Sequence, residues 1–276
     1  MPLQILCADG PLLAVNKPAG LPTQAPAGIP SLEAQVRDWL KANYDKPGGV
    51  YLGIPHRLDR PVSGVVVFAR NSKAAARLAE QFRQRQVMKV YWAVTERPPD
   101  PAGGYLQDWL SKIPDQARVE AVPAGTSGAR KALLRFRTIG PVNGGTLLEV
   151  IPETGRMHQI RIQLGRRGWP VVGDQQYGAG SCDPANRAGT RDLANRAGTR
   201  ESADGVDAPD SAGTADARGS LNGAPDDVGA IALHAMSLRV LHPVRYDPVL
   251  ITAPLPAHWQ RFLIPEGLFK AGLPGP

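Results

Sequence analysis

The sequence predicts an α+β fold, a mixed and mainly antiparallel sheet with a few flanking helices. Short apolar runs rich in β-branched residues recur along the chain, whereas only three segments repeat apolar residues at helical spacing. Apolar residues make up 42% of the 276 positions, so a sizeable core can form. These observations favour one sheet-based domain over a helical bundle.

The first elements follow from apolar runs and turn residues. Strands are predicted over residues 4–7 and 12–15, separated by an Ala-Asp-Gly-Pro turn. Lys17 directly follows the second strand, which places it either at the edge of a cleft or in a solvated loop. A helix is predicted to begin after Ser31, a capping residue, and to end near Asn43.

The middle of the chain continues with strands and a second helix. Residues 65–69 form an apolar run typical of a buried strand, and Asn71 can cap a helix after it. In the strand predicted over 89–94, Tyr91 lies on the face opposite Val, Trp and Val, and taken alone it is a core aromatic. Further strands are predicted over 131–138, 146–151 and 233–235, and residues 238–243 are predicted to form a strand and a turn.

A third helix is predicted to begin at Thr154, which would cap it, and to end at Gly165. His158 and Arg161 are three residues apart and would be neighbours on its surface. Arg156 would lie in its first turn, where free backbone N–H groups favour anions.

Composition divides the chain into one folded domain, an insert and a tail. The domain is predicted to comprise residues 1–178 and 231–262, with a C-terminal tail over 263–276. Residues 179–230 are rich in Ala, Gly, Asp, Ser and Thr, are acidic on balance, and repeat Ala-Asn-Arg-Ala-Gly-Thr-Arg. Such a segment buries too little apolar surface to offset its ordering entropy, so a disordered insert is expected.

Charge and cysteine content indicate the class of partner and the compartment. The formal charge is +7 and the pI about 9.6, which favours an anionic partner such as nucleic acid. Cys7 and Cys182 are far apart and lack metal-ligand spacing, which argues against a disulfide framework or a zinc site. With no signal peptide and no apolar run near the ~20 residues of a membrane span, we expect a cytoplasmic monomer without a membrane partner.

The densest group of reactive side chains lies in residues 56–64, His-Arg-Leu-Asp-Arg-Pro-Val-Ser-Gly. A charged loop that feeds a buried strand can hold a reactive group rigidly at the edge of a cleft. Asp59 is therefore the candidate reactive group, and a surface ion pair with its flanking arginines is the alternative.

This stretch resembles the signature loop of the RluA-type pseudouridine synthases. Other blocks resemble the same family in the same order: Leu-Leu-Ala-Val-Asn-Lys-Pro-Ala-Gly at 12–20, Thr-Gly-Arg-Met-His-Gln-Ile-Arg at 154–161 with Pro-Val-Val-Gly-Asp at 170–174, and Leu-His-Ala at 233–235. Some relatives carry a small N-terminal RNA-binding domain, which this chain is expected to lack.

The resemblance implies a pseudouridine synthase fold with a central RNA-binding cleft, and a uridine isomerase that acts on ribosomal or transfer RNA. It implies Asp59 as catalytic nucleophile or base, Arg161 as the cation that keeps it ionised, and Tyr91, in a Lys-x-Tyr-x-Ala strand, under the flipped base. RNA-binding positions are predicted at five further residues, of which the two histidines are expected to orient loops: Lys17, His56, Arg57, Arg156 and His158.

The implied reaction needs neither a redox change nor phosphate energy, so no cofactor and no metal are expected. The sequence contains no Gly-x-Gly-x-x-Gly motif and no P-loop, and its five histidines lack zinc spacing. Whether Asp59 attacks covalently or removes a ribose proton stays open.

Two other functions compete with this interpretation. One is a non-catalytic RNA-binding or ribosome-assembly protein on the same fold. The other is a hydrolase such as a glycosidase, which usually needs two carboxylates across the cleft. Glu153 and Asp174 are the candidates for a second carboxylate.

Overall fold

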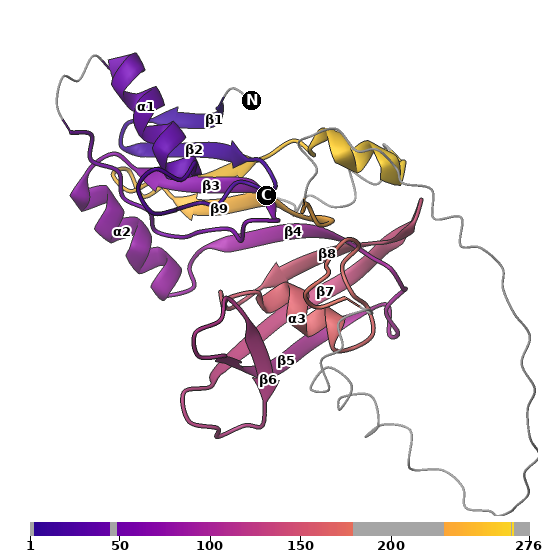
Figure 1. Cartoon of the computed structure of the whole chain (residues 1–276). Coiled ribbons are helices and arrows are strands. Elements are labelled where there is room, and N and C mark those ends of the chain that lie inside the picture. Colours follow the sequence, from indigo (N-terminus) through magenta and orange to yellow (C-terminus); the bar gives the residue numbers. More distant parts are fainter. Residues whose placement is uncertain (1–2, 45–48, 179–228, 266, 268–276) are drawn as a thin grey trace, which may run out of the picture.

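The computed structural model describes residues 3–44, 49–178, 229–265 and 267, so most of the predicted insert and tail lies outside the described residues. Within them, ten strands form one sheet in the order β1-β2-β3-β9-β4-β8-β7-β5-β6, and β10 pairs with β9 (Figure 1). β3 and β9 pair in parallel, whereas the other described pairings are antiparallel. The predicted fold class is confirmed.

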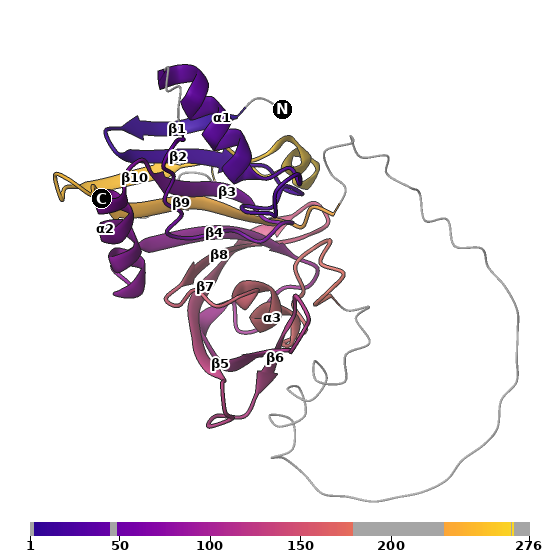
Figure 2. The same ribbon diagram turned by 60° about the vertical axis from the view of Figure 1, so that its left-hand side comes forward.

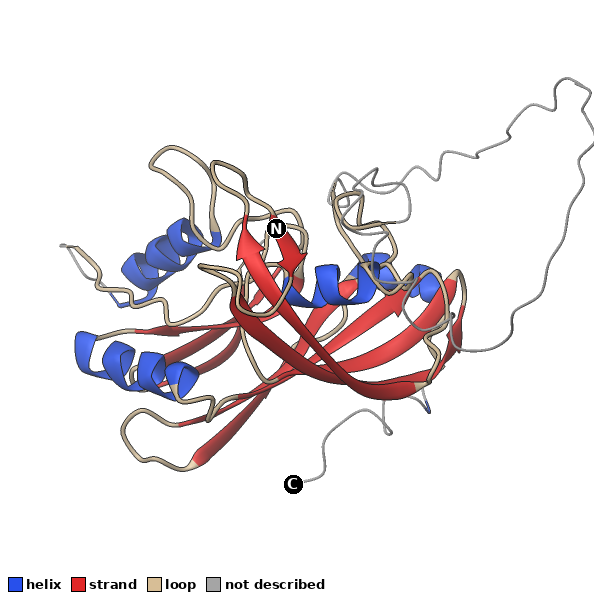
Figure 3. Cartoon of the chain, turned by 90° about the horizontal axis from the view of Figure 1, so that it is seen from below, coloured by secondary structure: helices blue, strands red, loops and turns tan. Residues whose placement is uncertain are grey.

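The strands include those predicted from sequence and three that were not predicted. Their bounds are β1 Gln4–Asp9, β2 Leu12–Lys17, β3 Ser63–Ala69, β4 Met88–Thr95, β5 Gly103–Lys112, β6 Val119–Val122, β7 Arg130–Val142, β8 Gly145–Pro152, β9 Leu233–Leu241 and β10 Pro248–Thr252. Figure 3 shows them as one strongly twisted layer. The unpredicted strands are β5, β6 and β10.

Two helices cover opposite faces of the N-terminal half of the sheet. Helix α1, Leu32–Tyr44, buries Leu32, Val36 and Leu40 in the same cluster as alternate residues of β2 and β3. Helix α2, Ser72–Arg83, packs on the other face. Its Ala74 and Leu78 are buried in a second cluster with the intervening residues of β2 and β3. Because successive residues of a strand point to opposite faces, β2 and β3 contribute apolar side chains to both clusters. No helix among the described residues is long and apolar enough to cross a membrane.

The half of the sheet that contains β5, β6, β7 and β8 curves around a short helix, α3, Gln159–Gly165 (Figure 2). The buried carboxylate of Asp108 on β5 fastens this helix, because it accepts hydrogen bonds from Gln163, Arg166 and Arg167. A 3-10 helix, η3, Ala257–Phe262, follows β10. The curvature places the N-terminus of α3 opposite the loop that precedes β3.

The parallel contact between β3 and β9 brings distant parts of the chain together at the centre of the sheet. Ser63 and Gly64 pair with His234 and Ala235, and the Ser63 hydroxyl lies 2.8 Å from Nδ1 of His234. Gly64 has φ +118°, and a Cβ there would lie 2.3 Å from the carbonyl oxygen of Ala235. Only glycine allows this close approach of the two backbones.

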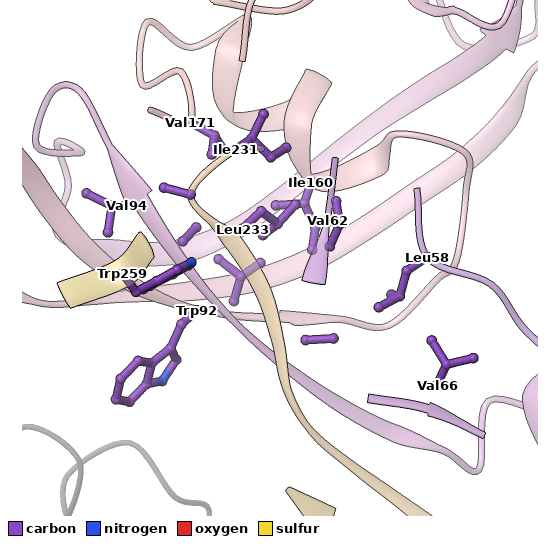
Figure 4. Close-up of a cluster of buried hydrophobic side chains, with 14 of the residues drawn as sticks. Leu58, Val62, Val66, Trp92, Val94, Ile160, Val171, Ile231, Leu233 and Trp259 are labelled. Atoms are coloured by element: carbon purple, nitrogen blue, oxygen red, sulfur yellow. The ribbon is translucent and has the colours of Figure 1, made fainter. Parts of the chain in front are cut away.

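The main core extends from this junction to the loop that holds Asp59. Leu58 and Val62 are buried in the same cluster as Ile160 of α3 and Leu233 of β9 (Figure 4). Apolar residues on both sides of Asp59 therefore anchor its loop in the core. Each anchor that is fully buried stabilises the loop by about 1.5–3 kcal/mol of transfer free energy.

Candidate active site

A cavity of about 480 Å³ lies between the Asp59 loop, β4 and the segment that leads into α3. Seven of the eight predicted site residues, from three segments of the chain, line it: His56, Arg57, Asp59, Tyr91, Arg156, His158 and Arg161. Lys17 does not belong to the lining. The described residues contain no group of three or more His, Cys, Asp or Glu side chains that could hold a metal ion.

The loop around Asp59 is held by hydrogen bonds on both sides of the residue. Thr23 Oγ1 donates to the carbonyl of Leu58 at 2.9 Å and accepts its N–H at 3.1 Å. The backbone N–H of Gly20 donates to the carbonyl of Arg60 at 2.8 Å. The neighbours of Asp59 are therefore fixed, while its own side chain is 25% exposed to the cavity.

The Lys17 side chain is fully buried, and its hydrogen bonds also hold this loop. Its ammonium donates to three backbone carbonyls, those of Pro18, Leu21 and Arg60, at 2.8, 2.6 and 3.2 Å. Burial lowers the pKa of Lys17 to about 7. The predicted contact of Lys17 with RNA is not supported by this position, because the ammonium is buried and already donates to three backbone carbonyls.

Arg161 is the cation that faces Asp59, and a second carboxylate orients it. Its Nε and Nη2 donate to Asp174 at 2.7 and 2.9 Å, and Nη2 also donates to Gln176 at 3.0 Å. The remaining nitrogen, Nη1, lies 3.7 Å from Oδ2 of Asp59. The planar guanidinium fork thus binds Asp174 at short range and directs its free edge toward Asp59.

His158 faces the same oxygen of Asp59 from another side. Its Nε2 lies 3.8 Å from Asp59 Oδ2, and its Nδ1 lies 2.9 Å from the hydroxyl of Tyr177. The residue precedes α3 in the left-handed conformation, with φ 52° and ψ 21°. Burial lowers the pKa of His158, although the charge of Asp59 acts in the opposite direction.

Tyr91 and Lys89 reach the cavity from β4, as the predicted alternation requires, while Val90 and Trp92 between and beyond them are buried. Burial raises the pKa of the Tyr91 phenol, and the negative charge of Asp59 raises it further. The phenol is therefore protonated at neutral pH. Lys89 donates to the carbonyl of Thr154 at 3.3 Å, and burial lowers its pKa to about 8.

His56 has a structural task. Its Nε2 accepts the backbone N–H of Val67 at 2.9 Å, and its ring stacks on Phe82 with centroids 4.6 Å apart. Burial lowers the pKa of His56 to about 3, so the ring stays neutral. This agrees with a residue that orients its loop.

Arg57 and Arg156, two of the predicted RNA contacts, also line the cavity. Arg57 is exposed, and Arg156 is half-buried, with its Nε donating to the carbonyl of Lys131 at 3.0 Å. Arg83, Arg85 and Lys89, a basic stretch that the sequence leaves open as an RNA-facing stripe or a solvated face, line the same cavity. Arg57, Arg85, Lys89 and Arg156 are called the basic rim below.

The third helix begins later than predicted. Thr154 does not cap it: its hydroxyl accepts the N–H of Leu133 at 2.9 Å and donates to Gln159 Oε1 at 2.7 Å. The helix starts at Gln159, and Arg156 lies in the loop before it. The hydrogen bonds of Thr154 instead hold the turn before α3, from which His158 and Arg161 face Asp59.

Three contributors to the site were missed or given another role. Asp174 was considered only as a second catalytic carboxylate, and Thr23 and Tyr177 received no specific role. Asp174 lies 13 residues after Arg161, and Thr23 lies 35 residues before Leu58. These separations match no local period, so periodicity alone could not find the contacts.

Comparison with solved structures identifies the fold. The chain is similar to the structure of human RNA Pseudouridylate Synthase Domain Containing 4, with a TM-score of 0.66 at 23% identity over 94% of this chain and 91% of that one. Together with the strand order, this similarity defines the architecture as the pseudouridine synthase fold.

Sequence comparison identifies the family. The sequence model of the RNA pseudouridylate synthase family matches residues 11–165. A ribosomal large subunit pseudouridine synthase D of Xylella fastidiosa is 33% identical over 264 residues, which cover 93% of this chain and 67% of the relative. An uncharacterized RNA pseudouridine synthase of Zymomonas mobilis is 36% identical, over 64% of this chain and 78% of the relative. The chain belongs to the RNA pseudouridylate synthase family, and the predicted RluA-type resemblance is confirmed.

Proposed function

We propose that this enzyme converts a specific uridine of ribosomal or transfer RNA to pseudouridine, with Asp59 as its catalytic carboxylate. Arg161 is the electrostatic partner of Asp59, and Tyr91 lies beneath the uracil or ribose. The catalytic domain comprises residues 1–178 and 231–262, and residues 179–230 are an insert without a catalytic role. The relative named for the ribosomal large subunit favours ribosomal RNA as the substrate.

The observation that carries the proposal is the position of the Asp59 carboxylate. It is the partly exposed anion in the wall of a cavity of about 480 Å³, and Arg161 Nη1 lies 3.7 Å from its Oδ2. Its loop is fixed on both sides, so the carboxylate is held in place before substrate arrives. A nucleophile or base needs this combination of access, fixed position and a stabilised negative charge.

The chemistry requires a uridine to leave its stack and enter the cavity. The bond between C1′ and N1 breaks, the base turns, and a bond between C1′ and C5 forms; C5 loses one proton and N1 gains one. Asp59 either attacks the nucleoside or removes a ribose proton to start this sequence. Tyr91 supports the base by packing and by proton donation, because its phenol stays protonated.

The basic rim supports RNA as the ligand. Arg57, Arg85, Lys89 and Arg156 line the cavity with Asp59, and they can neutralise phosphates on either side of an extruded nucleotide. Among the lining residues, Glu153 is the other carboxylate. Asp174 is absent from the lining and binds Arg161 through both oxygens, so it does not serve as the second acid of a glycosidase.

Asp59→Asn tests the proposal because it keeps the size of the side chain and removes its charge. RNA from a strain lacking the gene, complemented with either form, is mapped for pseudouridine. We expect the wild type to restore the modification and Asp59→Asn to restore none, while the purified variant binds the RNA as tightly as the wild type. Restored modification by Asp59→Asn would contradict the catalytic role. Unchanged modification in the deletion strain itself would favour a non-catalytic RNA-binding protein.

A further inference from the structure

A chain of polar contacts ends at the Asp59 carboxylate. The hydroxyl oxygen of Tyr177 accepts the backbone N–H of Val119 at 3.1 Å and lies 2.9 Å from Nδ1 of His158. Nε2 of the same imidazole lies 3.8 Å from Oδ2 of Asp59. The imidazole therefore connects β6 to the carboxylate.

These contacts select one tautomer of His158. The Tyr177 phenol has one proton and two acceptors within reach, His158 Nδ1 at 2.9 Å and the carbonyl of Val119 at 3.4 Å, so the proton is directed to the histidine. When Nδ1 accepts, the neutral ring carries its proton on Nε2. The other tautomer would turn a lone pair toward the negative charge of Asp59.

We propose that His158 is a positioning residue of the reaction, fixed by Tyr177 as the Nε2–H tautomer so that it orients the Asp59 carboxylate. This inference rests on the proposed catalytic role of Asp59. His158 Nε2 and Arg161 Nη1 face the same oxygen, Oδ2, at 3.8 and 3.7 Å. Torsion about the terminal bond of an aspartate is soft, so the neutral Nε2–H group and the Arg161 cation, both facing one oxygen, decide its orientation. Oδ1 is then the oxygen presented to the uridine.

The surroundings of His158 keep this arrangement rigid. The histidine side chain is only 11% exposed, and its carbonyl accepts the first backbone hydrogen bond of α3, from Ile162 at 3.0 Å. Burial lowers its pKa, which keeps the ring neutral at pH 7 although Asp59 favours protonation. His158 therefore acts on Asp59 more than on RNA, in contrast to the RNA contact predicted from sequence.

Nitrogen-15 NMR of the imidazole rings tests the tautomer in the wild-type protein without RNA. The His158 signal is assigned by its loss in His158→Asn. At pH 7 we expect a neutral ring protonated on Nε2, and in Tyr177→Phe a mixture of tautomers. The matched control is Tyr105→Phe, since Tyr105 is 68% exposed on β5, where it lies opposite Arg135 of β7. A ring protonated on Nδ1, an imidazolium, or unchanged shifts in Tyr177→Phe would overturn the inference.

Single-turnover kinetics test the effect on the reaction. His158→Asn places its amide near the position of Nδ1 and loses the group that faces Asp59, so we expect its rate to fall about 10- to 100-fold, the usual effect of one contact with a charged group. His158→Gln can reach the position of Nε2 and should retain more of the rate. The Kd for RNA should stay that of the wild type in both variants.

A loss of RNA affinity in place of rate, or equal rates for the two variants, would show that His158 does not position Asp59. These outcomes are separate from a failure of the proposed function. Full activity of Asp59→Asn overturns the catalytic role whatever the tautomer, whereas an inactive Asp59→Asn with an Nδ1–H ring overturns only the inference about His158.

Discussion

Asp174→Asn should reduce both the stability and the rate of the enzyme, because Asp174 anchors Arg161. The Asp174 side chain is 1% exposed and accepts Nε and Nη2 of Arg161 at 2.7 and 2.9 Å. Its Oδ1 also accepts the backbone N–H groups of Gln176 and Tyr177, at 3.1 and 3.2 Å. Asparagine keeps the shape, removes the charge and turns one acceptor into a donor that faces the guanidinium.

The size of the effect follows from burial of the pair. A guanidinium left buried without its counter-charge costs about 3–5 kcal/mol. Because each kcal/mol lowers the melting temperature of a domain of this size by about 2–4 °C, a fall of roughly 10 °C is expected. The rate should fall about 10- to 100-fold, since loss of a partner that orients a site residue has effects of this order.

Thermal unfolding and single-turnover pseudouridine formation measure the two effects. Arg161→Met with Asp174→Leu should recover only part of the lost stability, because apolar residues replace the buried ion pair but the backbone N–H groups of Gln176 and Tyr177 lose their acceptor, and it should stay inactive. Asp247→Asn is the control, since Asp247 forms an exposed ion pair with Arg245 and should leave both measurements unchanged. Wild-type stability and rate in Asp174→Asn would refute the anchoring role, and an active double variant would show that Arg161 is dispensable.

Three further predictions concern the loop, the core and the rim. Gly64→Ala should cost at least about 3 kcal/mol in urea denaturation, because a Cβ at φ +118° would meet the backbone of Ala235; an unchanged midpoint would contradict the close approach. The pKa of His56 falls from 6.5 to about 3 on folding, so the unfolded chain binds more protons between these values and stability decreases as pH falls below 6.5. His56→Gln, whose amide oxygen can still accept the N–H of Val67, should reduce the stability difference between pH 7 and pH 5 by about 2 kcal/mol; an equal difference would refute this. Arg57→Ala should lower the slope of log Kobs for RNA against log salt by about 1, and an unchanged slope would exclude a phosphate contact.

The sequence predicts the sheet, both large helices and most of the cavity wall, because these depend on local periodicity and on blocks of residues in a recognisable order. It does not predict β5, because the inward face of this strand carries Asp108 between Leu106 and Leu110, which breaks the apolar alternation. Only the tertiary fold supplies Arg166 and Arg167 as partners that make this buried charge acceptable.

The same limit explains the corrections at the site. A lysine after a strand suggests an exposed group, and the three carbonyls that bury Lys17 come from turns that the sequence does not place beside it. Thr154 has the sequence pattern of a helix cap, and only its contacts with Leu133 and Gln159 show a turn. Local patterns identify the residue types of a site, whereas long-range packing decides their tasks.

The strand order has a consequence for the synthesis of the protein. β9 lies between β3 and β4 at the centre of the sheet, yet ribosomes make it more than 130 residues after β4 ends. Until Leu233–Leu241 leaves the exit tunnel, the nascent polypeptide holds two half-sheets with unpaired inner edges and an incomplete nucleotide pocket. Catalytic competence is thus withheld until this central strand has been made, and the growing polypeptide cannot modify RNA before then.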